Sequence, residues 1–118
     1  MLYQIRSPAG AAVWSNGTLV SADGTKQSLA SEDFTIKVDS KWKSPHSHAV
    51  YPSSWTIEIP SEHLILQIAP YLPDQELNLS FTYWEGAVKI SGSRSGQEIS
   101  GQGYVELTGY GNPMNGQF

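Results

Sequence analysis

Two glutamates are the residues best suited to chemistry. Glu85 lies in the segment 83–90 and Glu106 in the segment 103–110, and both segments alternate apolar and polar residues as strands do. A two-residue turn at Ser95-Gly96 would pair these segments and place Glu85 directly opposite Glu106. Neighbouring carboxylates separate their pKa values, so that one can serve as an acid and the other as a base. Both are candidate catalytic residues, although we favour the alternative of a structural role facing solvent or a cation such as Arg6.

Two histidines form a weaker candidate. His46 and His48 flank Ser47, and residues at positions i and i+2 of a strand share a face. A metal site needs further ligands, and nothing nearby in the sequence identifies them. We therefore expect a solvated loop here, and neither a metal nor another cofactor. We interpret Asp74, in the polar run Asp74-Gln75-Glu76 after Pro73, as a turn former.

The four tryptophans and six tyrosines could fill a core or line a cavity. Buried tyrosine and tryptophan side chains need partners for their polar groups, which makes either role possible. We expect Trp55 and Trp84 to pack in the core, whereas Tyr51, Tyr83 and Tyr104 could line the open end of a small barrel. The candidate ligand-binding residues are Trp42, Tyr51, Tyr83, Trp84 and Tyr104.

Short antiparallel strands would position these side chains. The paired segments 83–90 and 103–110 form the longest hairpin, and 55–59 pairs with 64–69 through a turn that begins at Pro60. Residues 42–54 contain two prolines and no clear period, so we expect a loop with extended segments. No stretch predicts a helix. The sequence predicts about seven or eight strands in a barrel or sandwich, the others at 2–6, 18–20, 33–39 and 75–81.

Length and composition limit the classes of function. A chain of 118 residues is sufficient for one domain, which we place at residues 1–111, with 112–118 as a flexible tail. The net charge of −4 and the lack of any Lys/Arg run argue against nucleic acid and anionic membranes. No apolar run reaches the length of a membrane span, and no signal peptide precedes the first strand, so we expect a cytoplasmic protein.

Six phrases of the sequence resemble one family in the same order. They resemble the C-terminal part of the AttH/CrtC-like family, a lipocalin-like group that includes carotenoid 1,2-hydratases and proteins labelled "predicted secreted hydrolase". The match covers nearly the whole chain. The phrases are Leu2-Tyr3-Gln4-Ile5-Arg6; Gly17-Thr18-Leu19-Val20 with Ala22-Asp23-Gly24; Trp42-Lys43-Ser44 with Tyr51-Pro52 and Trp55; Asp74-Gln75-Glu76-Leu77; Tyr83-Trp84-Glu85-Gly86-Ala87-Val88; and Gly103-Tyr104-Val105-Glu106-Leu107-Thr108-Gly109-Tyr110.

The resemblance implies an all-β, antiparallel, lipocalin-like (calycin-type) β-barrel that is incomplete or open by itself. Family members are usually longer, with two such domains, and are often secreted or periplasmic. The residues proposed for hydratase chemistry in the family lie mostly upstream of the matching region. None of them can be transferred to a position in this chain.

Three hypotheses of function follow. The first is a non-catalytic module that binds a small hydrophobic ligand, isoprenoid or lipid-like, because a barrel of about eight strands can enclose one. The second is a hydratase- or hydrolase-like enzyme that uses Glu85 and Glu106. The third is an interaction unit that forms a homodimer through the uncovered edge strand Leu2–Arg6.

Overall fold

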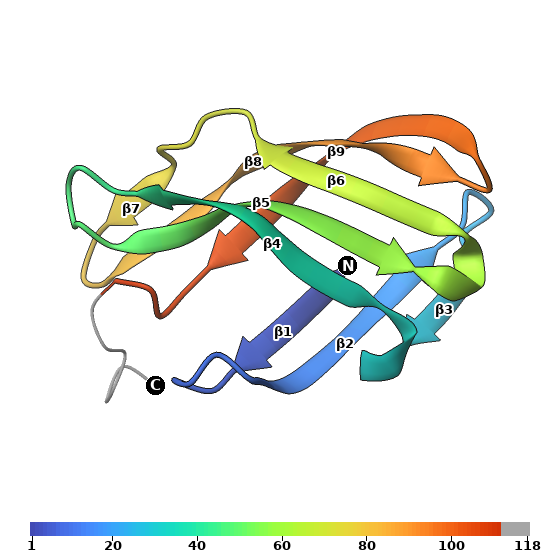
Figure 1. Ribbon diagram of the computed structural model, residues 1–118, viewed down its shortest axis with the longest axis horizontal. Coiled ribbons are helices and arrows are strands. Elements are labelled where there is room, and N and C mark those ends of the chain that lie inside the picture. The colour runs from blue at the N-terminus through green and yellow to red at the C-terminus, as the bar shows by residue number, and fades with distance from the viewer. Residues whose placement is uncertain (112–118) are drawn as a thin grey trace.

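Antiparallel strands make up nearly all of the regular structure of the chain (Figure 1). The computed structural model describes residues 1–111, so the predicted tail at 112–118 lies outside the described residues. No helix among residues 1–111 has the length and apolar character that a membrane crossing requires. The strands are β1 Leu2–Arg6, β2 Ala12–Val20, β3 Lys26–Leu29, β4 Thr35–Lys43, β5 Val50–Ile59, β6 Leu64–Pro70, β7 Glu76–Asn78, β8 Thr82–Arg94 and β9 Gln97–Leu107, with 3-10 turns η1 Ser31–Asp33 and η2 Pro60–Glu62.

The strands form two sheets, which do not close into a barrel within residues 1–111. The small sheet has the order β1-β2-β3. The large sheet has the order β4-β5-β6-β8-β9, and β7 pairs with the first residues of β8, beyond the end of β6. The fold is therefore all-β and antiparallel, consistent with an open lipocalin-like barrel, as the sequence predicted.

The turn and the register of the predicted long hairpin are confirmed, although its second strand, β9, ends at Leu107 rather than at Tyr110. Ser95 and Gly96 both have positive φ, 49° and 82°, which is the geometry of the two-residue turns that match strand twist. The register that follows pairs Trp84 with Leu107 and Glu85 with Glu106. Since side chains alternate along a strand, Trp84 points to the core and Glu85 to the opposite face.

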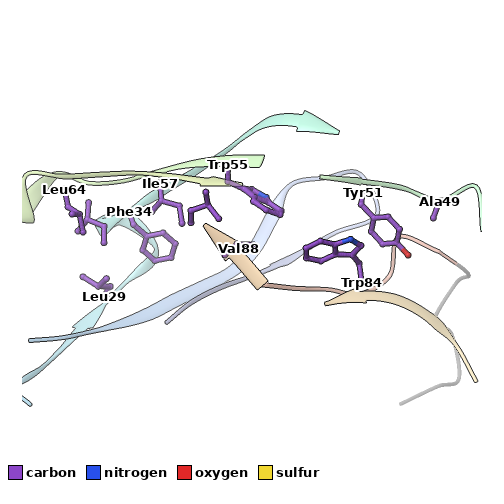
Figure 2. Packing of buried hydrophobic residues seen from close by; sticks show 11 residues of the cluster. Leu29, Phe34, Ala49, Tyr51, Trp55, Ile57, Leu64, Trp84 and Val88 are labelled. Carbon is purple, nitrogen blue, oxygen red and sulfur yellow. The ribbon is translucent and has the colours of Figure 1, made fainter. Parts of the chain in front are cut away.

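The core runs lengthwise through the molecule, and most of its buried residues lie on β5, β6 and β8 of the large sheet, with Leu29 on β3 of the small sheet (Figure 2). At one end Leu29 from β3 packs near Phe34 and Leu64, and at the other Trp84 packs near Tyr51. Trp84, Tyr51 and Leu29 are each 1% exposed. Burial of apolar area from both layers supplies the main driving force for this arrangement.

Two details of the strands go beyond what the sequence indicated. Residues 42–54 contain the expected loop at 44–49, and the extended segments on either side of it belong to β4, which continues to Lys43, and to β5, which starts at Val50. A register shift near Ser40 interrupts the alternation, and Pro52 lies beside this irregularity, where a missing N–H is tolerated. Residues 1–111 contain nine strands where the sequence indicated about seven or eight, because β3 is polar except for Leu29 and gives no alternating signal.

Candidate functional site

Polar side chains converge most strongly on the carboxylate of Glu76, at the start of β7. Its Oε1 accepts hydrogen bonds from Ser44 Oγ at 2.6 Å and Asn78 Nδ2 at 3.3 Å. Its Oε2 accepts hydrogen bonds from Ser47 Oγ at 2.6 Å and Tyr51 OH at 2.8 Å. These donors come from the β4–β5 loop, from β5 and from β7, which lie side by side in Figure 1. One carboxylate therefore connects three separate segments.

The β4–β5 loop is shaped to present its two serines. Ser44 is 0% exposed, and its Oγ accepts the backbone N–H groups of His46 at 3.0 Å and Ser47 at 3.2 Å while it donates to Glu76. The Oγ of Ser47 accepts the N–H of Ala49 at 3.1 Å. Serine hydroxyls commonly stabilise tight loops in this way. The loop is thus held both internally and against β7.

The surroundings keep the Glu76 carboxyl ionised and the Tyr51 phenol protonated. Burial by itself would raise the pKa of Glu76, but the donors Ser44, Ser47, Tyr51 and Asn78 together hold that pKa below its ordinary value. Burial and the bond to a charged carboxylate raise the pKa of Tyr51 above its ordinary value. The pair therefore combines an acceptor that stays charged with a donor that stays neutral.

Aromatic rings flank Tyr51. The Trp42 ring stacks on it with a centroid distance of 6.1 Å and an interplanar angle of 23°. The Tyr110 ring lies at 5.8 Å and 45°. Trp84 is buried at the same end of the core, and its Nε1 donates to the carbonyl oxygen of Pro73 at 2.8 Å (Figure 2). A cluster of largely buried aromatic rings therefore lies directly beside the Glu76 carboxylate.

His46, in the β4–β5 loop, pairs with Asp74, which lies two residues before β7. The His46 Nε2 and the Asp74 Oδ2 are 2.8 Å apart, and both side chains are substantially exposed. Such a pair orients an imidazole ring and can assist a proton transfer. Within residues 1–111 no three His, Asp or Glu side chains converge as metal ligands.

The predicted glutamate pair lies elsewhere. Glu85 is directly opposite Glu106, as expected, on the face of the β8–β9 hairpin that points away from the core. Tyr83 and Tyr104 lie on the same outer face. Partial burial and the negative charges of Glu85 and Glu106 raise the pKa of Tyr83. Among the described residues neither glutamate has a hydrogen-bonding or ionic side-chain partner, and their catalytic role stays a prediction.

The five predicted ligand-binding aromatics therefore occupy three places. Trp42 and Tyr51 stack together beside Glu76, Trp84 is enclosed in the core, and Tyr83 and Tyr104 are on the outer face. Two open hollows of about 370 and 330 Å³ are lined by other residues, including Trp14 in one and Trp55 in the other. Ligand binding at any of these positions stays a prediction.

The sequence interpretation missed Glu76 and its serines. They are 29 and 32 residues apart along the chain, and only the pairing of β5, β6, β7 and β8 brings them together. Two local features could have pointed to this site. Glu76 is a charged residue at the first position of a strand, and Ser44 directly precedes Pro45. Both patterns are also common in ordinary turns.

Comparison with known proteins agrees with the fold. The chain is similar to the crystal structure of a protein assigned as AttH from Nitrosomonas europaea, with 33% identity and a TM-score of 0.81 over 95% of this chain. It also resembles kievitone hydratase from Nectria haematococca, with 20% identity and a TM-score of 0.73 over 97% of this chain, a likeness that concerns the fold alone. The chain spans only 34% and 35% of those two proteins.

Sequence comparison assigns the family. No curated protein sequence matches the chain. The family model described as AttH-like matches residues 1–110, which is nearly all of the chain. The chain therefore belongs to the AttH-like family.

Proposed function

We propose that this chain is a lipocalin-like binding module that holds a small, largely apolar ligand of the isoprenoid or lipid type against Trp42 and Tyr51, without catalysing a reaction on its own. The observation that carries the proposal is the stacked Trp42–Tyr51 pair immediately beside the hydrogen-bonded Glu76. Apolar faces bind the body of a ligand, and a few fixed polar groups orient its end. A hydroxyl-bearing isoprenoid has both features.

The state of Glu76 supports binding rather than catalysis. Its pKa is lowered and four donors already surround it. A general acid works best with a pKa near the operating pH. A carboxylate that stays ionised at neutral pH and already accepts four hydrogen bonds is better suited to fixing the positions of Tyr51 and the β4–β5 loop than to delivering a proton.

Calorimetric titration with farnesol, a C15 isoprenoid alcohol, tests the proposal. The wild-type chain should bind farnesol, and Trp42→Ala should weaken the affinity about ten-fold, because one aromatic contact is worth roughly 1–2 kcal/mol. Trp14→Phe is the matched control, since Trp14 is 57% exposed on β2 of the other sheet. Equal loss of affinity in both variants, or no binding by the wild type, would contradict the Trp42–Tyr51 location.

A second candidate function is a hydratase- or hydrolase-like enzyme that uses Glu85 and Glu106. The direct opposition of the two carboxylates favours it, because like charges that face each other destabilise a sheet and their presence suggests a functional role. One group would protonate a substrate while the other removes a proton from water. If so, Glu106→Gln should abolish water addition to an isoprenoid alkene, while Glu98→Gln on the same strand retains it. Equal rates in the two variants would exclude this role.

A third candidate is an interaction unit that dimerises through β1. This strand pairs only with β2 among the described residues, and Ile5 on it is 59% exposed. Unpaired strand edges recruit further strands. Light scattering coupled to size-exclusion chromatography measures the resulting state directly.

A further inference from the structure

The segment that follows β9 covers the proposed ligand site. The strand ends at Leu107, and three residues later the Tyr110 ring lies against Tyr51 at 5.8 Å. Tyr51 is 1% exposed, with Trp42 on one side and Tyr110 on another. Tyr110 itself is 36% exposed. The partly exposed ring of Tyr110 thus lies directly against the buried ring of Tyr51.

Ring packing, rather than a hydrogen-bonded ladder, holds Tyr110 in place. Among residues 1–111, no hydrogen bond involves residues 108–111. Gly109 has φ of +86°, a left-handed conformation that other residues adopt only under strain. Gly111 packs against Thr82, so closely that a Cβ there would lie 3.0 Å from the Thr82 Cβ. Tyr110 therefore lies between the bend at Gly109 and the contact of Gly111 with Thr82, and no hydrogen bond among the described residues opposes its displacement.

From this geometry we propose that Tyr110 is a hinged lid, which must swing away from Tyr51 before a ligand can reach the Trp42–Tyr51 surface. The inference rests on the ligand site proposed above. An enclosed Tyr51 cannot contact a ligand while Tyr110 stays in place. Opening requires rotation about Gly109 and loses no hydrogen bond among the described residues.

A lid of this kind lowers the apparent affinity for a ligand. Minor open states are commonly populated at about 0.1–10%, and the apparent dissociation constant rises by the inverse of that fraction. Tyr110→Ala should therefore bind farnesol about ten-fold or more tightly than wild type. Tyr110→Phe keeps the ring and should behave as wild type.

A second variant opens the lid while the ring remains. Gly109→Ala places a side chain at φ of +86°, which strains the closed conformation without altering any group that faces the site. It should also bind farnesol more tightly than wild type. Thermal unfolding of each variant establishes that the fold is intact before affinities are compared.

A measurement without ligand tests the lid independently. The full chain labelled with 3-fluorotyrosine gives ¹⁹F signals that Tyr51→Phe and Tyr104→Phe assign. Tyr104 is 66% exposed and serves as the accessible reference. In wild type the Tyr51 signal should show little difference between H₂O and D₂O, and in Tyr110→Ala and Gly109→Ala it should approach the Tyr104 difference.

The outcomes separate the two proposals. A solvent-dependent Tyr51 signal in both variants, with tighter farnesol binding, supports the lid. The same signal with no farnesol binding by any variant supports the lid and contradicts the proposed ligand site. An unchanged Tyr51 signal in both variants, or an unchanged affinity for farnesol where wild type binds it, overturns the lid.

Discussion

At the scale of single residues, Glu76 is the group whose environment departs furthest from that of an ordinary surface carboxylate. It is the shared acceptor for Ser44, Ser47 and Tyr51, each within 2.8 Å. Hydrogen bonds to a charged group contribute more than neutral ones, and a buried donor left without its acceptor is destabilising. Glu76 therefore stabilises the junction between the β4–β5 loop and β7.

Replacing this carboxylate should lower stability in a pH-dependent way. We expect Glu76→Gln to reduce the free energy of unfolding by about 1–3 kcal/mol at pH 7. The folded-state pKa of Glu76 lies below the ordinary glutamate value of 4.5, so its contribution to stability is present above about that pH and is lost as the pH falls through the folded-state pKa. The difference between wild type and variant should therefore shrink in acid. Urea unfolding at several pH values measures it.

An exposed carboxylate provides the control for this prediction. Glu98 lies near the tip of the β8–β9 hairpin and has no hydrogen-bonding partner for its side chain among the described residues. Glu98→Gln should leave the unfolding free energy within about 0.5 kcal/mol of wild type at each pH. An equal effect of the two substitutions would show that net charge, rather than the Glu76 junction, sets the pH dependence.

At the scale of elements, the Gln75 side chain completes a sheet that the strands leave interrupted. β6 ends opposite Val88 and β7 begins opposite Trp84, which leaves a gap beside Gly86. The Gln75 Nε2 donates to the carbonyl oxygen of Ala87 at 3.1 Å, and the Ala87 N–H donates to the Gln75 Oε1 at 3.0 Å. The side-chain amide thus takes the place of a peptide group, and a Cβ on Gly86 would overlap it.

Filling this gap should be destabilising. We expect Gly86→Ala to lower the free energy of unfolding by about 1–3 kcal/mol, because the added methyl displaces the Gln75 amide. Gly101→Ala is the control, since Gly101 is also in a strand but nothing lies within 4 Å of an added Cβ. Thermal or urea unfolding compares the two.

A double substitution identifies the cause. In Gly86→Ala combined with Gln75→Ala the overlapping side chain is gone, so the joint cost should be smaller than the sum of the two single costs. Strict additivity would mean that Gly86 is required for a reason other than its contact with Gln75.

These elements also show which parts of the structure could be predicted from the sequence. The register of the β8–β9 hairpin was predictable, because Ser95-Gly96 sets the turn and alternation then places Trp84 and Leu107 on the face that points to the core, whereas the ends of the two strands were not. β3 was not predictable, since four mainly polar residues carry no period. The Glu76 junction depends on contacts over 25–32 residues, which no local pattern encodes.

At the scale of the whole molecule, the open arrangement leaves strand edges uncovered among residues 1–111. β1 is one of them, at the edge of the small sheet. The outward face of β1 carries the exposed side chains of Tyr3 and Ile5. Trp14 on β2 lies opposite Ile5, and its Nε1 donates a hydrogen bond to the Tyr3 OH at 3.0 Å. An exposed apolar edge of this kind favours association with another strand.

Pairing of β1 with β1 of a second copy would cover this edge with a closed two-fold arrangement. We expect the wild-type chain to form a dimer at micromolar concentration and Ile5→Lys to be monomeric, because two lysines at the joined edges repel each other and resist burial. Val50→Lys is the matched control, since Val50 is 47% exposed but belongs to β5 of the other sheet, and it should remain dimeric. Light scattering coupled to size-exclusion chromatography gives the mass of each protein. A wild-type mass equal to one chain at all working concentrations would remove the edge strand as a dimer interface, and a monomeric Val50→Lys would move the interface to the large sheet.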